Sequence, residues 1–181
     1  MAKVASSYLR TNGAALTRAA DQCYWSNVIG RPQAMTIYCR FVEVGGITVN
    51  DGFVFNVGGT GVPQFNVIMP SGGAAYRIRH FNATSSVTGT LATAPTVGQV
   101  VELVAQLSAN GSVQLHQSIN GATATSTTAS GALALAAAWN LPRLSLAEDG
   151  NNSFHSAIAF RDVVIFRGVK DITTMRRLAG T

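Results

Sequence analysis

The sequence predicts an all-β domain, a sandwich or barrel of antiparallel strands. Short stretches rich in Val, Ile, Thr, Phe and Tyr recur between clusters of Gly, Asn, Ser and Pro, which is typical of that fold class. Patterning with the helical period is scarce. With 181 residues, of which 47% are hydrophobic, the chain can bury one core without disulfides. We therefore expect one compact, ordered body.

Residues 36–44 form the clearest predicted strand. Because side chains alternate between the two faces of a strand, Ile37, Cys39 and Phe41 share one face. Glu43 is the next residue in that register. The residues between them take the opposite face, so both surfaces of this strand carry apolar side chains.

Two further strands, residues 52–57 and 65–69, flank a loop over residues 58–63 that is rich in glycine. Glycines permit a positive φ there, and Pro63 cannot donate a hydrogen bond to a strand ladder. The loop therefore separates two neighbouring strands.

Residues 75–81 also alternate. Arg77 and Arg79 fall on one face, and Ile78 and His80 fall on the other. We expect the apolar face to meet the core, and the arginine face to be solvated or paired.

A hairpin is predicted between residues 99–107 and 112–119. Asn-Gly is the strongest short signal for a two-residue turn, and it stands at Asn110 and Gly111. A second Asn-Gly, residues 120–121, supplies the next turn.

The last third of the chain is less sharply patterned. Residues 122–138 are a low-complexity run of Ala, Thr, Ser, Gly and Leu, interpreted as a loop with one strand or as an extended arm that packs on a neighbour. Residues 132–138 would also suit a short helix on propensity. The remaining expectations are a strand over 141–147, a turn over 148–152, a long buried strand over 156–167, and two helical turns over 171–178 capped by Asp171.

Motifs at both ends and in the middle of the chain occur together in one family. Residues 6–21 read Ser-Ser-Tyr-Leu-Arg-Thr and, four residues on, Leu-Thr-Arg-Ala-Ala-Asp, with Arg10 where the pattern often has proline. Residues 97–121 hold the Asn-Gly hairpin, and residues 154–178 place Asp-Val-Val-Ile-Phe before the helical turn. In this order the motifs resemble the concanavalin A-like (laminin-G-like) domain of bacteriophage virion, tail-fibre and decoration proteins.

The resemblance implies two curved antiparallel sheets of the jelly-roll type and a short C-terminal helical turn. It divides the chain into an N-terminal arm, residues 1–20, and a sandwich domain, residues 21–181. It also implies a phage origin, synthesis in the host cytoplasm and a place on the virion surface.

The charge and hydropathy of the chain limit the kinds of molecule that it can be expected to bind. Only 12% of residues are charged, and the net charge is +5. The basic residues are almost all arginines that stand apart from one another, and Arg176-Arg177 is the one adjacent basic pair. Nucleic acid is therefore a disfavoured partner, whereas contact with other protein subunits is favoured. The longest apolar run, residues 132–139, is too short to span a membrane.

We expect no catalytic site and no cofactor. Hydrolysis of a glycosidic bond needs two facing carboxylates, and no predicted strand offers more than one. His80, His116 and His155 lack a metal-ligand spacing, and the two cysteines, Cys23 and Cys39, are expected to be buried thiols. Calcium is the alternative worth testing, through Asp149 with Asn151 and Asn152, or through Asn50 with Asp51.

The leading functional hypothesis is a non-enzymatic virion structural protein, such as a capsid decoration or cement subunit. It would form a homo-oligomer such as a trimer and bind a major capsid or tail protein. The alternative is a carbohydrate-binding receptor module of a tail or fibre, with a host surface glycan as its partner; an unusual glycosidase is a third hypothesis. The candidate partner or glycan contacts are Tyr24, Trp25, Tyr76, Arg77, Arg79 and Trp139.

Overall fold

A computed structural model describes residues 23–26, 29–45, 51–59, 63–131, 133–139, 141–147 and 157–179. These residues form two antiparallel sheets and one short C-terminal helix, which confirms the predicted all-β sandwich. The N-terminal arm, the turn at 148–152, His155 and the calcium candidates Asn50, Asp149, Asn151 and Asn152 lie outside the described residues. No helix in the described ranges is long and apolar enough to cross a membrane.

One sheet has six strands in the order β1-β10-β3-β4-β5-β6. All neighbouring strands in it run antiparallel. Its strands are β1 (Cys23–Ser26), β10 (Leu141–Leu146), β3 (Gly52–Gly58), β4 (Gln64–Met69), β5 (Arg77–Phe81) and β6 (Ser86–Thr90).

The other sheet has five strands in the order β11-β2-β7-β8-β9, again all antiparallel. Two strands of 11 residues, β11 and β2, run side by side along one end of this sheet. Its strands are β11 (Ala157–Arg167), β2 (Met35–Gly45), β7 (Val100–Leu107), β8 (Val113–Ile119) and β9 (Thr125–Ala129).

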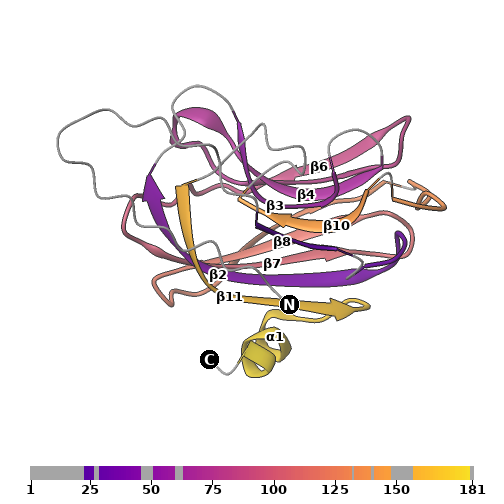
Figure 1. Cartoon of the computed structure of the whole chain (residues 1–181). Helices are drawn as coiled ribbons and strands as arrows, with labels where there is room; N and C mark the ends of the chain where they lie inside the picture. The colour runs from indigo at the N-terminus through magenta and orange to yellow at the C-terminus, as the bar shows by residue number, and fades with distance from the viewer. Residues whose placement is uncertain are drawn as a thin grey trace.

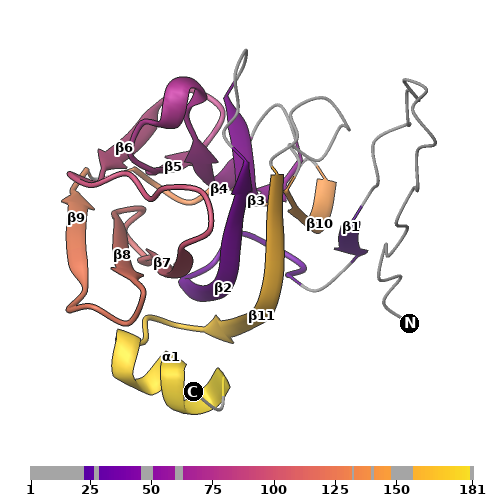
Figure 2. The same cartoon turned by 90° about the vertical axis from the view of Figure 1, so that its left-hand side faces the viewer.

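The two sheets stack face to face, and the core lies between them. Figures 1 and 2 show the two layers, with the helix outside the five-stranded one. Both sheets bow in the same direction in Figure 1, so the outer surface of the six-stranded sheet is concave and that of the five-stranded sheet is convex. We call these surfaces the concave face and the convex face. The core is aliphatic and aromatic, with Ile37, Phe41, Phe55, Phe65 and Leu103 fully buried.

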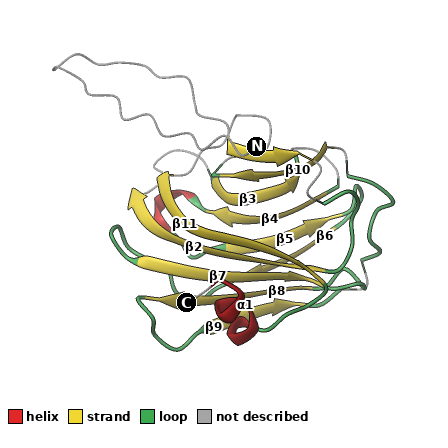
Figure 3. Ribbon diagram, turned by 60° about the horizontal axis from the view of Figure 1, so that its bottom comes forward, coloured by secondary structure: helices red, strands yellow, loops and turns green. Residues whose placement is uncertain are grey.

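The α-helix α1 (Ile172–Ala179) lies against the convex face (Figure 3), and a 3-10 turn, η1 (Ser71–Gly73), follows β4. As predicted, Asp171 caps α1: the Asp171 carboxylate accepts a hydrogen bond from the Thr174 backbone N–H at 2.8 Å. Met175 is fully buried with Tyr38 and Val104, which point outward from the five-stranded sheet. The helix therefore covers the apolar side chains that face away from the core.

The predicted Asn-Gly turns are confirmed. Asn120 and Gly121 both have positive φ, 51° and 77°, as a two-residue type I′ hairpin turn requires. Gly111 has φ 81°, and a Cβ there would stand 1.8 Å from the carbonyl oxygen of Leu133. That position therefore accepts only glycine without a local rearrangement.

Three expectations need correction. The strands β1 and β6 were not predicted; Ser-Val-Thr-Gly-Thr in β6 is a polar edge strand with one apolar residue, and such a sequence resembles a loop. The β11 strand is present, but its side chains are half-buried or exposed because it lies at an edge of its sheet. Residues 133–138 are not helical; backbone groups there bond to distant segments instead, with the Leu133 N–H donating to the Asn110 carbonyl oxygen at 3.2 Å and the Ala134 carbonyl oxygen accepting from Asn82 at 3.0 Å. The strand expected within residues 122–138 is β9.

Candidate functional site

A continuous row of polar side chains crosses the concave face. The strand register places its members opposite one another on all six strands. Because each row member occupies an outward position, the row lies on the side of the sheet away from the core. From β1 to β6, the row is Tyr24, Ser145, Asn56, Asn66, Arg79 and Thr88.

Alternation within the strands explains why these residues face outward. In β4, Phe65 and Val67 belong to the core cluster, so Asn66 between them points to the concave face. In β5, Ile78 and His80 are buried and the arginines beside them are half-buried, as the sequence predicted. The row forms because, at this level of the sheet, the register aligns the outward-facing residues of all six strands.

The centre of the row is a cluster of amides. Asn66 Nδ2 donates to Gln64 Oε1 at 2.6 Å and to Asn56 Oδ1 at 3.3 Å. Arg79 donates from its terminal nitrogen to the same Gln64 oxygen at 2.9 Å. Asn56 and Asn66 are fully buried, although they face away from the core. Residues of three adjacent strands, β3, β4 and β5, are thus held in one hydrogen-bonded group.

The two ends of the row differ in chemistry. At the β1 end, Tyr24 is 41% exposed, and the Arg143 guanidinium of β10 lies 4.5 Å from the centre of its ring. At the β5 end, Arg77 pairs with Asp51, whose other oxygen accepts the Ser71 backbone N–H at 3.1 Å. An aromatic ring with an arginine over it therefore stands at one end, and an ion pair stands near the other.

Several polar atoms of the concave face have no partner in the described structure. They are buried nitrogen and oxygen atoms, and burying such an atom without a partner costs about 1–3 kcal/mol. These atoms are themselves shielded, so a ligand on this face would contact the exposed Tyr24 and Thr88 and the half-buried Arg79. The shielded atoms are Asn66 Oδ1, Ser145 Oγ and the Nε atoms of Arg77, Arg79 and Arg143.

Burial lowers the pKa of the Arg79 guanidinium, and the neighbouring charge of Arg77 lowers it further, against a smaller opposing effect of Asp51. The guanidinium nevertheless keeps its charge at neutral pH, because the ordinary pKa of arginine is so high. The concave face consequently holds a partly desolvated positive charge.

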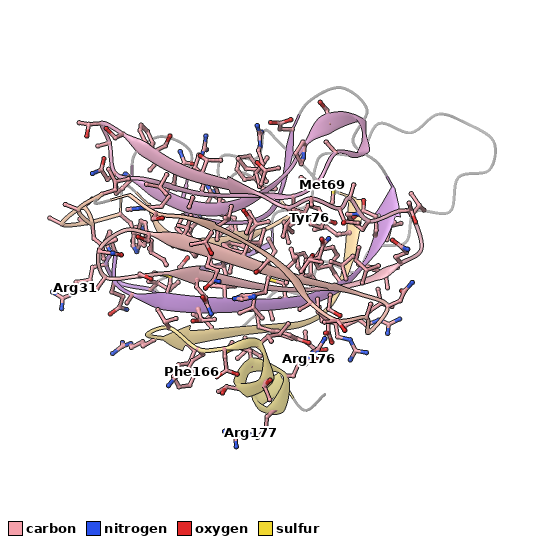
Figure 4. All side chains as sticks on the ribbon, turned by 180° about the vertical axis from the view of Figure 1, so that it is seen from behind. Arg31, Met69, Tyr76, Phe166, Arg176 and Arg177 are labelled. Atoms are coloured by element: carbon pink, nitrogen blue, oxygen red, sulfur yellow. The ribbon has the colours of Figure 1, made fainter. Side chains whose placement is uncertain are left out.

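Tyr76 and Trp139, two of the predicted contacts, lie in the core instead. Their exposed fractions are 1% and 6%, so neither ring is available at the surface of the chain. Tyr76 packs edge-on against Phe41 at 6.1 Å and donates from its hydroxyl to Glu43 at 2.6 Å. Figure 4 shows Tyr76 and Met69 at one end of the sandwich. The side chain of Trp25 lies outside the described residues.

The other predicted groups have local partners. His80 is buried and its Nδ1 lies 3.1 Å from the Gly111 carbonyl oxygen; burial lowers its pKa. Cys39 is a buried free thiol, as expected, whereas the side chain of Cys23 is outside the described residues. Among the described residues, no three His, Cys, Asp or Glu side chains form a metal cluster. The Asp51 carboxylate is already engaged by Arg77 and Ser71.

Arg77, Arg79 and Tyr24 were among the predicted contacts and lie on the concave face, whereas the amides of the row were not predicted. The sequence did contain a signal for them: Asn56 in β3 and Asn66 in β4 each stand between two apolar residues of their strand. A polar side chain at such a position must find hydrogen bonds. Whether Asn56 and Asn66 lie opposite one another on neighbouring strands depends on the register, which the sequence does not specify.

The fold is similar to that of solved structures of two kinds. The full-length tailspike protein 2 of an Escherichia coli O157:H7 bacteriophage matches with a TM-score of 0.64 at 14% identity, over 86% of this chain and 23% of the tailspike. The chain thus spans less than a quarter of the tailspike. The CBM40 module of the Ruminococcus gnavus IT-sialidase matches with a TM-score of 0.56 at 10% identity, over 89% of this chain and 97% of the module.

The same CBM40 module bound to α2,6 sialyllactose matches with a TM-score of 0.51 at 10% identity. Comparison of the sequence with family models and with curated proteins gives no match. The structural likenesses show the fold, and they confirm the predicted concanavalin A-like β-sandwich.

Proposed function

We propose that this chain is a carbohydrate-binding module that recognises an oligosaccharide through its concave face, in the setting of a bacteriophage tail or fibre. The observation that carries the proposal is the polar row on the concave face, with Tyr24 and Thr88 exposed at its two ends. Sugars present many hydroxyl groups that both donate and accept, and these side chains offer both roles.

The dimensions of the row favour an oligosaccharide over a single sugar. Strands in a sheet lie about 4.8 Å apart, so Tyr24 and Arg79, four strand spacings apart, are separated by about 19 Å. Tyr24 supplies an exposed aromatic surface against which the apolar side of a sugar ring can pack. The exposed Thr88 hydroxyl, at the other end of the row, would then bind the hydroxyl groups of a ring further along the chain of sugars.

Binding without cleavage is part of the proposal. Among the described residues, the carboxylate bonded to the concave face is that of Asp51, and it pairs with Arg77. A glycosidase needs a second, protonated carboxyl group facing the first. The likeness to a tailspike and to a module that binds a sialylated sugar supports the proposal at the level of the fold. Capsid decoration and oligomer formation stay predictions of the sequence.

The test is binding of the full chain to an array of neutral and acidic oligosaccharides, compared with three variants. Tyr24→Ala removes the exposed ring, and Thr88→Ala removes the exposed hydroxyl at the other end of the row. Gln114→Ala, on β8 of the convex face, is the control for loss of a polar side chain. We expect the first two to weaken binding about tenfold, since each lost contact contributes on the order of 1 kcal/mol, and the control to bind normally.

Thermal unfolding of each variant separates lost binding from lost folding. Because Tyr24 and Thr88 are exposed, both variants should fold normally. An array on which no saccharide is retained would contradict the proposal. Equal weakening by Tyr24→Ala and Gln114→Ala would place binding elsewhere than the concave face.

A further inference from the structure

The six strands of the concave sheet carry arginines but no acidic residue. Arg77 and Arg79 lie in β5 and Arg143 in β10, and all three are half-buried. The strands β1, β3, β4 and β6 contain no charged residue. Asp51, just before β3, neutralises Arg77. Two positive charges of this face are therefore left without an acidic partner in the described chain.

The five strands of the convex sheet show that this excess is not a general property of the protein. They carry three arginines, Arg40, Arg161 and Arg167, and three acids, Glu43, Glu102 and Asp162. Arg40 lies within ion-pair distance of two of those acids. Arg40, the half-buried arginine of this sheet, thus has acidic partners, and Arg161 and Arg167 are exposed to solvent. Arg79 and Arg143 are half-buried like Arg40 but have no acidic partner in the described chain.

The guanidinium groups of Arg79 and Arg143 each also have an N–H donor that is not used in the described structure. The Nε atoms of Arg79 and Arg143 are buried and have no acceptor in the described structure. The terminal nitrogen of Arg79 is held by the neutral oxygen of Gln64. A buried positive charge that meets only neutral acceptors is costly, and an anion that supplies paired oxygens offsets that cost.

We infer that the saccharide bound by the concave face carries an anionic group, and that Arg79 is the residue that binds that group. This inference rests on the proposed function. A guanidinium presents two parallel N–H groups to the two oxygens of a carboxylate or to those of a phosphate. The ligand class is therefore an acidic oligosaccharide, with a uronic acid, a sialic acid or a phosphorylated sugar at the β5 end of the row.

The inference makes Arg79 a specificity residue, in addition to the general sugar contacts at Tyr24 and Thr88. Loss of the Arg79 charge should reduce binding of acidic saccharides far more than binding of neutral ones. A merely structural role of Arg79 would reduce both together. Its test therefore compares the two ligand classes on each variant.

The experiment uses the array members that the wild-type chain retains, each paired with a neutral form. Carboxylates are converted to methyl esters, and phosphates are removed enzymatically, so that the two anion types are distinguished. α2,6 sialyllactose and lactose are included as one fixed pair. The variants are Arg79→Gln, which removes the charge, Arg79→Lys, which keeps it but loses the paired donors, and Arg31→Gln. Arg31 is exposed, belongs to no strand of the concave sheet and lies at one end of the molecule in Figure 4, so its variant is the control for net charge.

We expect the retained saccharides to be acidic, and neutralisation to weaken their binding by about tenfold to a hundredfold, the scale of a lost charge-assisted hydrogen bond. Arg79→Gln should have the same effect, Arg79→Lys a smaller one, and Arg31→Gln almost none. Retention of neutral saccharides that bind as tightly as acidic ones would overturn the inference and leave the proposed function intact. Equal losses for both ligand classes in Arg79→Gln would also overturn it. An empty array would remove the proposed function itself.

Discussion

The two outer faces of the sandwich handle charge in opposite ways. On the convex face, Glu102 accepts hydrogen bonds from Arg176 and from the Tyr38 hydroxyl, and Arg40 lies 3.9 Å from its carboxylate. On the concave face, Arg79 meets a neutral amide, and its Nε has no partner among the described residues. The half-buried arginine of the convex face thus has acidic neighbours within ion-pair distance, whereas Arg79 has none in the described part of the chain.

This contrast distinguishes charged groups that stabilise the fold from charged groups that are available to bind a ligand. Groups that close a network inside the chain stabilise the fold, whereas buried polar groups without partners lower its stability and persist at functional sites. In Figure 4 the Arg176 side chain of α1 points toward the sheet, whereas that of Arg177 points away from it. Loss of a half-buried arginine charge should therefore change stability in opposite directions on the two faces.

Met175→Ala, on the convex face, should lower the free energy of unfolding more than any other variant considered. Met175 is fully buried beneath α1 with Tyr38 and Val104, and removing such a side chain costs about 3 kcal/mol. We expect chemical denaturation to show this loss, and hydrogen exchange to show that α1 opens first. Thr173→Ala, at an exposed position of the same helix, is the control. Carbohydrate binding at the concave face should be unchanged, and a change there would contradict the independence of the two faces.

Glu102→Gln is expected to destabilise the fold by about 2 kcal/mol, because hydrogen bonds to a charged group are lost at a largely buried site. Arg176 would keep a neutral acceptor but lose its counter-charge. Asp162→Asn is the matched control: its ion pair with Arg40 is 3.8 Å long and about one-third exposed, so its loss should cost less than about 0.5 kcal/mol. Equal losses from the two variants in urea titrations would contradict this account of the network.

Arg79→Gln, on the concave face, should leave stability unchanged or raise it by up to about 1 kcal/mol, because it removes a partly desolvated charge that has no acidic partner. Arg40→Gln, the corresponding change on the convex face, should lower stability, since Arg40 stands between Glu102 and Asp162. Urea titration of both variants measures the sign. A clear destabilisation by Arg79→Gln would show that the concave face is stabilised internally after all.

The smallest effect concerns pH and lies between the sheets. Burial raises the pKa of Glu43 above its ordinary value of 4.5, against a smaller lowering by the Tyr76 hydrogen bond. The folded chain therefore binds a proton that the unfolded chain releases, and stability falls as the pH rises above 4.5 through the raised pKa. Glu43→Gln should remove that fall: its melting temperature should exceed the wild-type value at pH 8 and match it at pH 4. A pH dependence that stays unchanged in the variant would assign the effect to another group.

Much of the fold could be predicted from local patterns. The period of two in β2 and β5 gave the inward and outward faces correctly, and the Asn-Gly pairs gave both turns around β8. Both signals are local: alternation depends on the strand backbone alone, and the turn depends on residues that tolerate positive φ. The edge strands β1 and β6 carry neither signal strongly, and they were missed.

Alternation along each strand is enough to predict which side chains can face outward, including Arg77, Arg79 and the asparagines in β3 and β4. Which of these side chains are neighbours depends on the tertiary structure. The row from Tyr24 to Thr88 joins strands from distant parts of the chain through their register. The tertiary structure also decided that Tyr76 and Trp139 are core residues. Pairing between strands is a non-local property, and burial depends on the second sheet, so neither can be read from the spacing of residues within one strand.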